Sequence, residues 1–244
     1  MKLLFSLFAL SFIVIMSFSR CTKTVTQTIT DTVVVKDTVV RTLVVKPGPD
    51  DGQDGLVNSI PLYSGINLKG NPGFGAGEWT YNAQGYGEGT TRGYLEFVAL
   101  DGLPDSAHIK SATLYLYGLP TAKDNAFLTG NSLYPGSPYS SYTDNSCWLK
   151  RVTANWDLDS ITWNNMPTTT DINAATVPST TSQWNNNDTV DVTKLVQDIV
   201  YSKQNYGFCL QLKNEQIYRC QGFAGSRCSD STLWPKLVVT YSVY

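Results

Sequence analysis

The sequence is poor in charged residues and nearly without histidine. Only 16% of its 244 residues are charged, against about 25% in an average soluble protein. Lys and Arg total 18 and Asp and Glu total 20, so the formal net charge is −2. A protein that binds nucleic acid needs a basic face that displaces counterions from the phosphates. The composition therefore argues against a nucleic-acid partner.

The residue patterns of common enzyme active sites are also missing. The one histidine, His108, precedes an expected strand and lies beside Lys110, which is typical of a turn or strand edge rather than of a general base. The chain has no HExxH motif and no Ser/His/Asp order. The glycine cluster at 73–77 lacks the strand–turn–helix context of a nucleotide-binding loop. We therefore expect a protein that is not an enzyme.

Sequence patterns typical of metal-binding sites are also scarce. No CxxC pair stands near a histidine, which argues against zinc. Acidic residues gather in two places, Asp157 with Asp159, and Asp54 with Asp50 and Asp51. Neither group has EF-hand spacing, and calcium needs about six to eight oxygen ligands in a shaped loop. We expect these acids to lie in solvated turns and expect no cofactor, with a structural calcium ion as the alternative.

The only long hydrophobic run lies at the N-terminus. Residues 3–16 are apolar except for two serines, and Lys2 precedes them. At roughly 14 residues the run is short for a membrane span of about 20. A basic start, a short apolar core and small polar residues after it are typical of an export signal. We therefore assign residues 1–20 to a signal peptide.

Cys21 follows this run directly and resembles the acylated cysteine of bacterial lipoprotein precursors. Arg20 stands where those precursors usually carry a small residue, and ordinary cleavage after Ser19 is the alternative. Five cysteines are present, and four of them can pair among themselves, which leaves Cys21 for a lipid. We expect a lipid-anchored protein on the outer surface or periplasmic side of a bacterial membrane.

A Thr/Val-rich segment, 22–46, follows the signal. β-Branched residues stiffen an extended chain, and no Gly or Pro interrupts them. An exposed strand of this kind is able to pair with a copy of itself, so self-association is a further expectation. Residues 47–55 are an acidic Gly/Pro linker. The sequence thus predicts a stalk and linker over 21–56 and one folded domain over 57–244.

The hydrophobic pattern of the folded domain has a period of two. In the segment 109–117, Ala112, Leu114 and Leu116 share one face. The same alternation recurs in three other segments: 94–98, 206–212 and 236–243. Such strands, separated by Gly, Asn, Pro and Ser, predict an antiparallel β-sandwich. One short helix is expected over 193–201, with Thr193 as its N-cap.

Several motifs follow one another between residues 92 and 242. They are Tyr94-Leu-Glu-Phe with Ile109–Tyr117, Trp156 with Thr162-Trp163 and Pro167, Val190-Asp-Val-Thr193, Tyr206-Gly-Phe, and Trp234–Tyr241. This order resembles the DNRLRE-type domains of bacterial surface proteins, which are also classed as carbohydrate-binding module family 96. The resemblance implies an all-β fold, a jelly-roll β-sandwich, in an extracellular protein that is often associated with polysaccharide.

The remaining cysteines are expected to form disulfides, because an exported protein meets an oxidising environment. Cys220 and Cys228 lie close enough in sequence to bridge a hairpin or loop. Cys147 and Cys209 both lie on expected strands. Three connectivities are open to four cysteines, and the pairs 220–228 and 147–209 are favoured.

Loop aromatics are the candidate ligand contacts. The apolar faces of sugar rings stack on exposed Trp and Tyr, while amides and hydroxyls bind the sugar hydroxyls. The candidates, which all lie in expected loops, are Trp79, Tyr81, Tyr86, Tyr134, Tyr139, Tyr142 and Trp184. Trp156, Trp163 and Trp234 match positions of the resembled family that we expect to be packing residues.

The sequence therefore predicts a non-catalytic surface protein that binds a polysaccharide or other glycan through its jelly-roll domain. The alternative is a structural or adhesive subunit that assembles with copies of itself or with another protein. The expanded segment 118–146 and the glycine-rich segment 57–92 depart from the resembled pattern. Since loops on a rigid scaffold are where binding usually changes, these segments leave the ligand unnamed.

Overall fold

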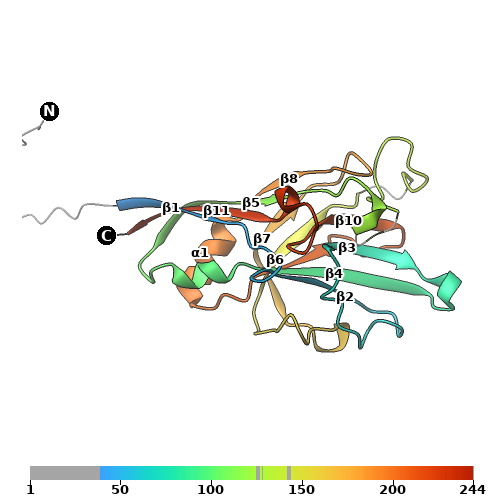
Figure 1. The fold of residues 1–244 in the computed structure, drawn as a ribbon, viewed down its shortest axis with the longest axis horizontal. Helices are drawn as coiled ribbons and strands as arrows, with labels where there is room; N and C mark the ends of the chain where they lie inside the picture. The colour runs from blue at the N-terminus through green and yellow to red at the C-terminus, as the bar shows by residue number, and fades with distance from the viewer. Residues whose placement is uncertain (1–38, 125–126, 128, 142–143, 244) are drawn as a thin grey trace, which may run out of the picture. The chain divides into compact units, whose positions relative to one another are not determined.

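The computed structural model describes residues 39–124, 127, 129–141 and 144–243. Its strands form two antiparallel sheets (Figure 1). The first has the order β1 (Val39–Val45), β11 (Lys236–Val243), β5 (His108–Leu116) and β8 (Asp188–Asp191). The second has the order β10 (Arg219–Ala224), β3 (Gly73–Thr80), β4 (Glu88–Glu96), β9 (Phe208–Leu212), β6 (Cys147–Val152) and β7 (Thr169–Val177), with β2 (Gln53–Asn58) beside β4. The predicted all-β sandwich is confirmed.

The single α-helix of the described residues, α1 (Thr193–Ser202), covers part of the first sheet. Short 3-10 turns occupy Asn82–Gln84, Val98–Gly102, Ala122–Asp124, Trp163–Asn165 and Ser231–Leu233. Thr193 is not the N-cap that its position predicts, because Val192 takes that place without a side-chain bond. The Thr193 hydroxyl instead donates to Asp191 at 2.6 Å and accepts from the Ala112 amide of β5 at 2.9 Å. The helix start is thereby attached to the sheet.

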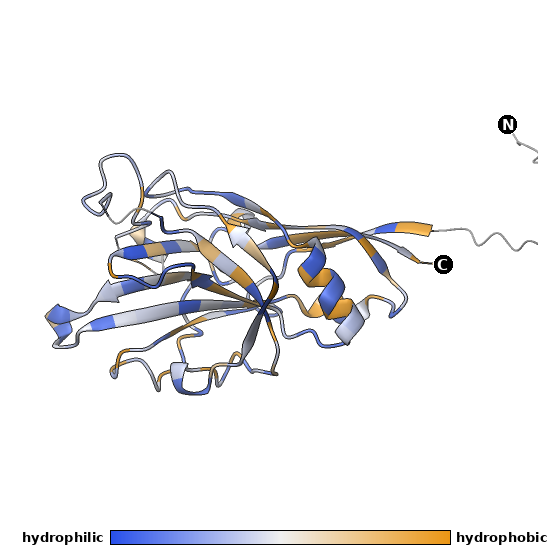
Figure 2. Ribbon diagram, turned by 180° about the vertical axis from the view of Figure 1, so that it is seen from behind, coloured by the Kyte–Doolittle hydropathy of each residue, from blue (hydrophilic) through white to orange (hydrophobic). Residues whose placement is uncertain are grey.

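Two hydrophobic clusters lie on opposite faces of the second sheet. The main core fills the space between the sheets and includes Leu95, Leu114 and Leu195. The second cluster includes Tyr94 and Trp156 and lies beneath the 153–167 segment. Hydrophobic and hydrophilic residues alternate along many of the strands (Figure 2), as side chains that point to opposite faces require.

The three tryptophans that were expected to be packing residues each contact a buried hydrophobic cluster. Trp156 is 8% exposed, and its indole nitrogen donates to the Tyr206 carbonyl at 2.9 Å. Trp163 packs against the same cluster, with the Arg92 guanidinium 5.2 Å from its ring centre. The Trp234 indole donates to the Cys228 carbonyl at 2.8 Å. These three residues are therefore packing residues, as predicted.

The sandwich begins earlier in the chain than the sequence analysis places it. Residues 39–45 of the expected stalk form β1, which pairs with β11 along its whole length (Figure 1). Residues 53–58 of the expected linker form β2, which pairs with β4. A β-branched run without Gly or Pro suits a stalk and a strand equally well. Residues 39–45 form a strand because they pair with β11, which places Leu43 and Val45 against the main core.

The predicted disulfides are not present. All four cysteines beyond residue 38 are buried, and no disulfide joins them in the described part of the chain. In the β6–β9 register Cys147 lies opposite Leu212, whereas Cys209 lies opposite Lys150. The side chains of Cys147 and Cys209 therefore leave opposite faces of the sheet and belong to different clusters, which excludes this pairing. Cys220 directs its sulfur to the Gly130 carbonyl at 3.2 Å.

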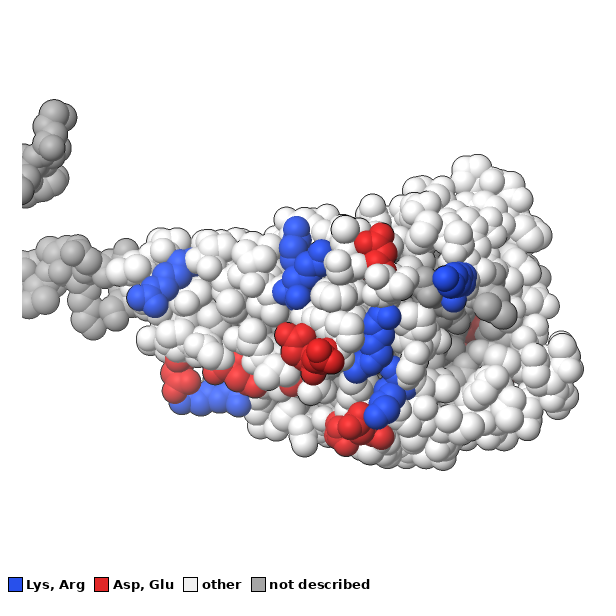
Figure 3. Space-filling model, viewed as in Figure 1, with Lys and Arg blue, Asp and Glu red and all other residues white. Residues whose placement is uncertain are grey.

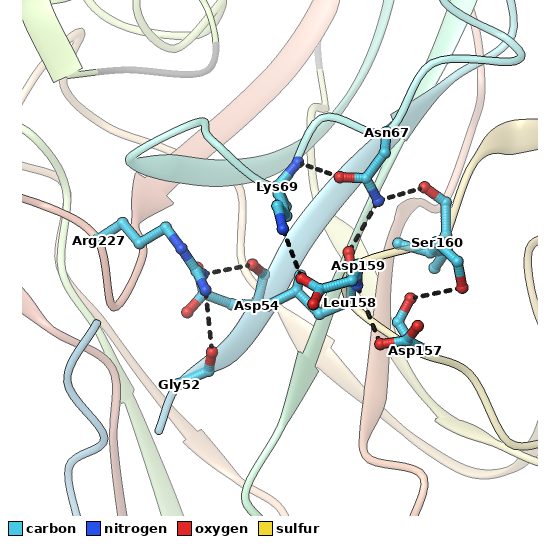
Figure 4. A network of polar contacts seen from close by, with 10 residues as sticks. Gly52, Asp54, Asn67, Lys69, Asp157, Leu158, Asp159, Ser160 and Arg227 are labelled. Atoms are coloured by element: carbon cyan, nitrogen blue, oxygen red, sulfur yellow. Dashed lines mark hydrogen bonds and ion pairs between the residues drawn. The ribbon is translucent and has the colours of Figure 1, made fainter. Parts of the chain in front are cut away.

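The acids considered as calcium ligands take part in a network of polar contacts (Figure 4). Asp157 accepts a hydrogen bond from the Asp159 amide at 3.0 Å, and Asp159 forms an ion pair with Lys69 at 2.7 Å. Asp54 is fully buried and accepts from the Ser226 amide at 2.9 Å. Arg227 donates to the backbone carbonyl of Asp54 at 3.3 Å. These contacts tie β2 to the 225–228 loop, and they tie the 67–69 segment to the 157–161 loop.

Candidate functional site

A pocket of about 540 Å³ opens beside the hairpin of β3 and β4. Strand β2, the 59–72 loop and the segment around residue 127 complete its walls. Its lining mixes aromatic rings and aliphatic groups with amides and hydroxyls: Leu56, Asn58, Tyr63, Leu68, Asn71, Trp79, Thr80, Tyr81, Ala83, Gln84, Thr91, Phe127 and Thr129. Two of the predicted ligand contacts, Trp79 and Tyr81, are therefore brought into one site.

Trp79 stands at the junction of this pocket and an aromatic cluster. Its ring meets Tyr139 nearly edge-on, with centres 4.8 Å apart, and meets Tyr218 in the same way at 5.4 Å. Tyr139 and Tyr218 stack on each other at 5.3 Å. Edge-to-face and stacked contacts are favourable ring geometries, so the cluster holds the half-buried Trp79 in one orientation.

Tyr81 is held by a buried amide. Asn58, 3% exposed, donates from Nδ2 to the Tyr81 hydroxyl at 2.7 Å and to the Thr91 hydroxyl at 2.8 Å. Its Oδ1 accepts from the Ile60 amide at 3.0 Å. Burial raises the pKa of the Tyr81 phenol, and the Asn58 and Thr91 contacts oppose that shift only in part. The phenol therefore stays uncharged and keeps its proton for hydrogen bonding.

The Tyr81 ring lies over Gly89, the residue that faces Trp79 across the hairpin. A Cβ on Gly89 would approach Ile60 Cγ2 to 2.3 Å and Tyr81 Cε2 to 2.9 Å, both too close for real contacts. The φ angle of Gly89 is one that other residues also adopt, so backbone conformation does not require glycine here. Glycine is required because the side chains of Ile60 and Tyr81 leave no room for a Cβ. The ring of Tyr63 completes this wall, edge-on to Tyr81 at 6.4 Å.

Buried amides order the expanded loop that delivers Tyr139. The Asn131 Oδ1 accepts from the Gly222 amide of β10 at 2.9 Å. The Asn145 Nδ2 donates to the Cys220 carbonyl of the same strand at 2.8 Å. Both asparagines are almost fully buried. The described part of the loop is thus fastened to the edge of the second sheet.

The other predicted contacts lie outside the pocket lining. Tyr86 and Tyr134 are half-buried. Trp184 packs beside Gly130, with its Cη2 3.0 Å from where a Cβ would be. Tyr142 falls outside the described residues. Their roles in binding stay predictions.

Tyr218, Tyr63 and Asn58 were missed by sequence reasoning. Tyr218 precedes β10, and only the pairing of β10 with β3, in which Arg219 lies opposite Glu78, brings it beside Trp79. Asn58 was assigned to the glycine-rich start of the domain, and the pairing of Asn58 with Thr91 places it under Tyr81. No local sequence signal predicts either of these long-range pairings.

A second hollow, about 490 Å³, lies on the outer face of β6, β7 and β9. Its only aromatic lining residue is Trp148, whose ring lies 4.1 Å from the Lys213 ammonium. Lys150 and Asp171 form an ion pair at 2.6 Å in the same hollow. Charge therefore dominates this surface, in contrast to the pocket beside Trp79.

Metal and membrane features are sparse in the part of the chain that the structure describes. It contains no group of three or more His, Cys, Asp and Glu side chains placed to hold a metal ion. Its helices are too short or too polar to span a bilayer. His108 lies exposed at the start of β5.

Comparison with known proteins identifies one family. The profile of carbohydrate-binding module family 96 matches residues 73–241. This span runs from the first residue of β3 into β11 and includes Trp79, Tyr81, Tyr139 and Tyr218, whereas β1 and β2 precede it. No curated protein matches the chain.

Gly89 offers a test of the pocket geometry. Gly89→Ala should lower the stability of the domain by about 1–3 kcal/mol, because the added methyl group forces Ile60 and Tyr81 apart. Gly87→Ala is the matched control on the same hairpin, since a Cβ there meets nothing within 4 Å. Chemical denaturation of both variants measures the difference. Equal stability of the two variants would show that Tyr81 does not require the glycine.

Proposed function

The chain belongs to carbohydrate-binding module family 96, and from this premise we propose that its sandwich binds a glycan in the pocket beside Trp79. The observation that carries the proposal is the convergence of two predicted contacts, Trp79 and Tyr81, on one concave site. The pocket volume of about 540 Å³ falls within the usual range of ligand sites.

The lining has the two properties that sugar recognition needs. Trp79, Tyr81 and Tyr63 supply ring surfaces for the C–H faces of a sugar. The amides and hydroxyls around them, such as Gln84 and Thr80, are donors and acceptors for sugar hydroxyl groups. The ring orientations are set before binding by Tyr139, Tyr218 and Asn58, which reduces the entropy lost when the ligand binds.

We also propose that binding is not followed by catalysis. Glycoside hydrolysis usually requires two carboxyl groups on either side of the scissile bond. The described lining of this pocket contains no Asp, Glu or His. Its tyrosine hydroxyls and amides suit hydrogen bonding rather than proton transfer at neutral pH.

Trp79→Ala and Tyr81→Ala test the site. Each truncation removes a ring face, so each should weaken glycan binding by about tenfold or more, which is 1.4 kcal/mol or greater. Tyr201→Ala is the control, because Tyr201 is 65% exposed on α1, away from the β3–β4 hairpin (Figure 1). Affinity electrophoresis and calorimetry against glycans that a glycan array selects would measure the change. Undiminished binding by both pocket variants, with folding intact, would refute the site.

For the cellular location we propose export and lipid attachment through Cys21. The support is the signal-like N-terminus and a cysteine directly after it, both outside the described residues. Cys21→Ser should abolish incorporation of labelled fatty acid and release the protein from the membrane fraction. Retention of Cys21→Ser in that fraction would rule out the anchor.

A second candidate function is assembly through the exposed edge of the first sheet. Strand β1 is the last strand of that sheet, and the described residues pair it only with β11. Val40 and Val44 on this strand are each 60% exposed. An unprotected apolar edge favours the addition of a strand from another copy.

Charge on the β1 edge tests this second function. The double variant Val40→Lys, Val44→Lys should convert oligomers of the full chain to monomers, since charged edges resist strand pairing. Val98→Lys is the control, because Val98 is 45% exposed but lies outside both sheets. Size-exclusion chromatography with light scattering reports the mass. A wild-type chain that is monomeric throughout would remove the assembly function and leave glycan binding untouched.

A further inference from the structure

The glycine cluster at 73–77 allows an aromatic ring to approach β3 closely. Gly75, Gly77 and Trp79 alternate along the strand, so all three belong to the same face. A Cβ on Gly75 would come within 2.7 Å of Phe127 Cε2. A Cβ on Gly77 would come within 2.7 Å of Phe127 Cε1 and 2.8 Å of Phe127 Cζ. The Phe127 ring therefore lies directly over the backbone of β3 at these two glycines, on the face that bears Trp79.

Phe127 is also part of the pocket beside Trp79. It is 9% exposed and belongs to the lining. Phe127 and Thr129 come from the expanded segment 118–146, whereas the other described lining residues come from β2, β3, β4, the hairpin turn and the 59–72 loop. The segment 118–146 is one of the two that depart from the pattern of the family. One wall of the pocket is thus supplied by a part of the chain in which this protein differs from that pattern.

The chain next to Phe127 is held in place by hydrogen bonds. The Gly130 amide donates to the Phe127 carbonyl at 3.0 Å, and Nε2 of Gln183 donates to the Thr129 carbonyl at 2.9 Å. The Asn131 amide donates to the Gln183 carbonyl at 3.0 Å. Because the backbone of β3 lies behind the ring and these bonds hold its loop, the ring has no space into which it could retreat from a ligand.

This wall acts through its shape. The phenyl ring of Phe127 carries no donor or acceptor for a sugar hydroxyl, so it contributes apolar surface and excluded volume. In Figure 3 few charged side chains lie at the end of the domain that bears the β3–β4 hairpin. A limit set by excluded volume applies to charged and uncharged sugars alike.

From these contacts we infer that Phe127 is a specificity-determining residue of the glycan site. Its ring closes the pocket on the side of β3. The site therefore takes a stretch of glycan chain in which the sugar beside the ring carries no branch or bulky substituent. This role rests on the proposed function of the same pocket and adds a class of ligand, an unsubstituted glycan segment.

The test compares unsubstituted and substituted oligosaccharides of equal length on the full chain. The pairs are mannohexaose with galactosyl-substituted mannohexaose, xylohexaose with arabinosyl-substituted xylohexaose, and hexameric alginate with its O-acetylated form. In each pair whose unsubstituted member binds, that member should bind the wild-type chain about tenfold tighter than the substituted one, because the substituent would overlap the ring. Calorimetry measures both Kd values.

A graded series of variants tests the ring itself. Phe127→Ala leaves the glycine backbone of β3 as the wall, so the preference should fall to about twofold or less as the substituent enters the vacated space. Phe127→Leu keeps most of the volume and should keep the preference. Phe127→Val removes less packing than Phe127→Ala and should give an intermediate ratio. A role in stability alone would weaken both ligands by the same factor and leave their ratio unchanged.

Failure of this role and failure of the proposed site give different results. An unchanged ratio in Phe127→Ala, with binding lost in Trp79→Ala, would overturn the role of Phe127 and leave the pocket assignment standing. Equal binding of both members of a pair by the wild-type chain would do the same. Undiminished binding in Trp79→Ala, with the ratio unchanged in Phe127→Ala, would place the ligand elsewhere and overturn both. Failure of every oligosaccharide of the series and every glycan on the array to bind the folded protein would also overturn both.

Discussion

The hydrogen-bonded ladder of β4 is the constraint on which both cores and the pocket depend. One side of this strand pairs with β2, while the other side pairs first with β3 and then with β9. Because successive side chains leave opposite faces, Leu95 enters the core between the sheets and Tyr94 enters the cluster around Trp156. Thr91, paired with Asn58 on one side and with Gly77 on the other, lies in the lining of the pocket. A shift of this strand by one residue would exchange the faces and dismantle all three features.

The pocket is built by contacts that are each weak but mutually supporting. Gly89 leaves room for the Tyr81 ring, Asn58 fixes the Tyr81 hydroxyl, and the stacked pair Tyr139 and Tyr218 braces Trp79. None of these residues carries charge at neutral pH. The scarcity of charged residues in the whole sequence thus extends to the pocket, because this site, the best shaped for a ligand, offers rings, amides and hydroxyls. These are groups that can contact the C–H faces and hydroxyls of a sugar.

Local sequence patterns predicted the fold more completely than they predicted the candidate site. The period-two alternation around Leu114 and Leu237 predicted the strands of the sandwich, and the spacing of Leu195 and Ile199 predicted the helix. Of the predicted contacts, Trp79 and Tyr81 meet in the pocket and Tyr139 braces it, whereas Tyr86, Tyr134 and Trp184 lie outside its lining. An aromatic residue in an expected loop can be recognised from the sequence, whereas the residues that surround it in space cannot. Tyr63 and Tyr218 belong to segments that only the pairing of β2, β10 and their partners brings together.

The sequence by itself determined the fold class, the family and the main strands, because alternation and motif order are properties of short segments that need no distant partner. Only the tertiary structure decided which face each residue takes and what it touches. In that structure part of the expected Thr/Val stalk forms β1, Cys147 and Cys209 lie on opposite faces of one sheet, and Trp79 and Tyr81 line one pocket. The physical reason is that register and face are fixed by pairing between strands far apart in sequence, and no local pattern carries that information.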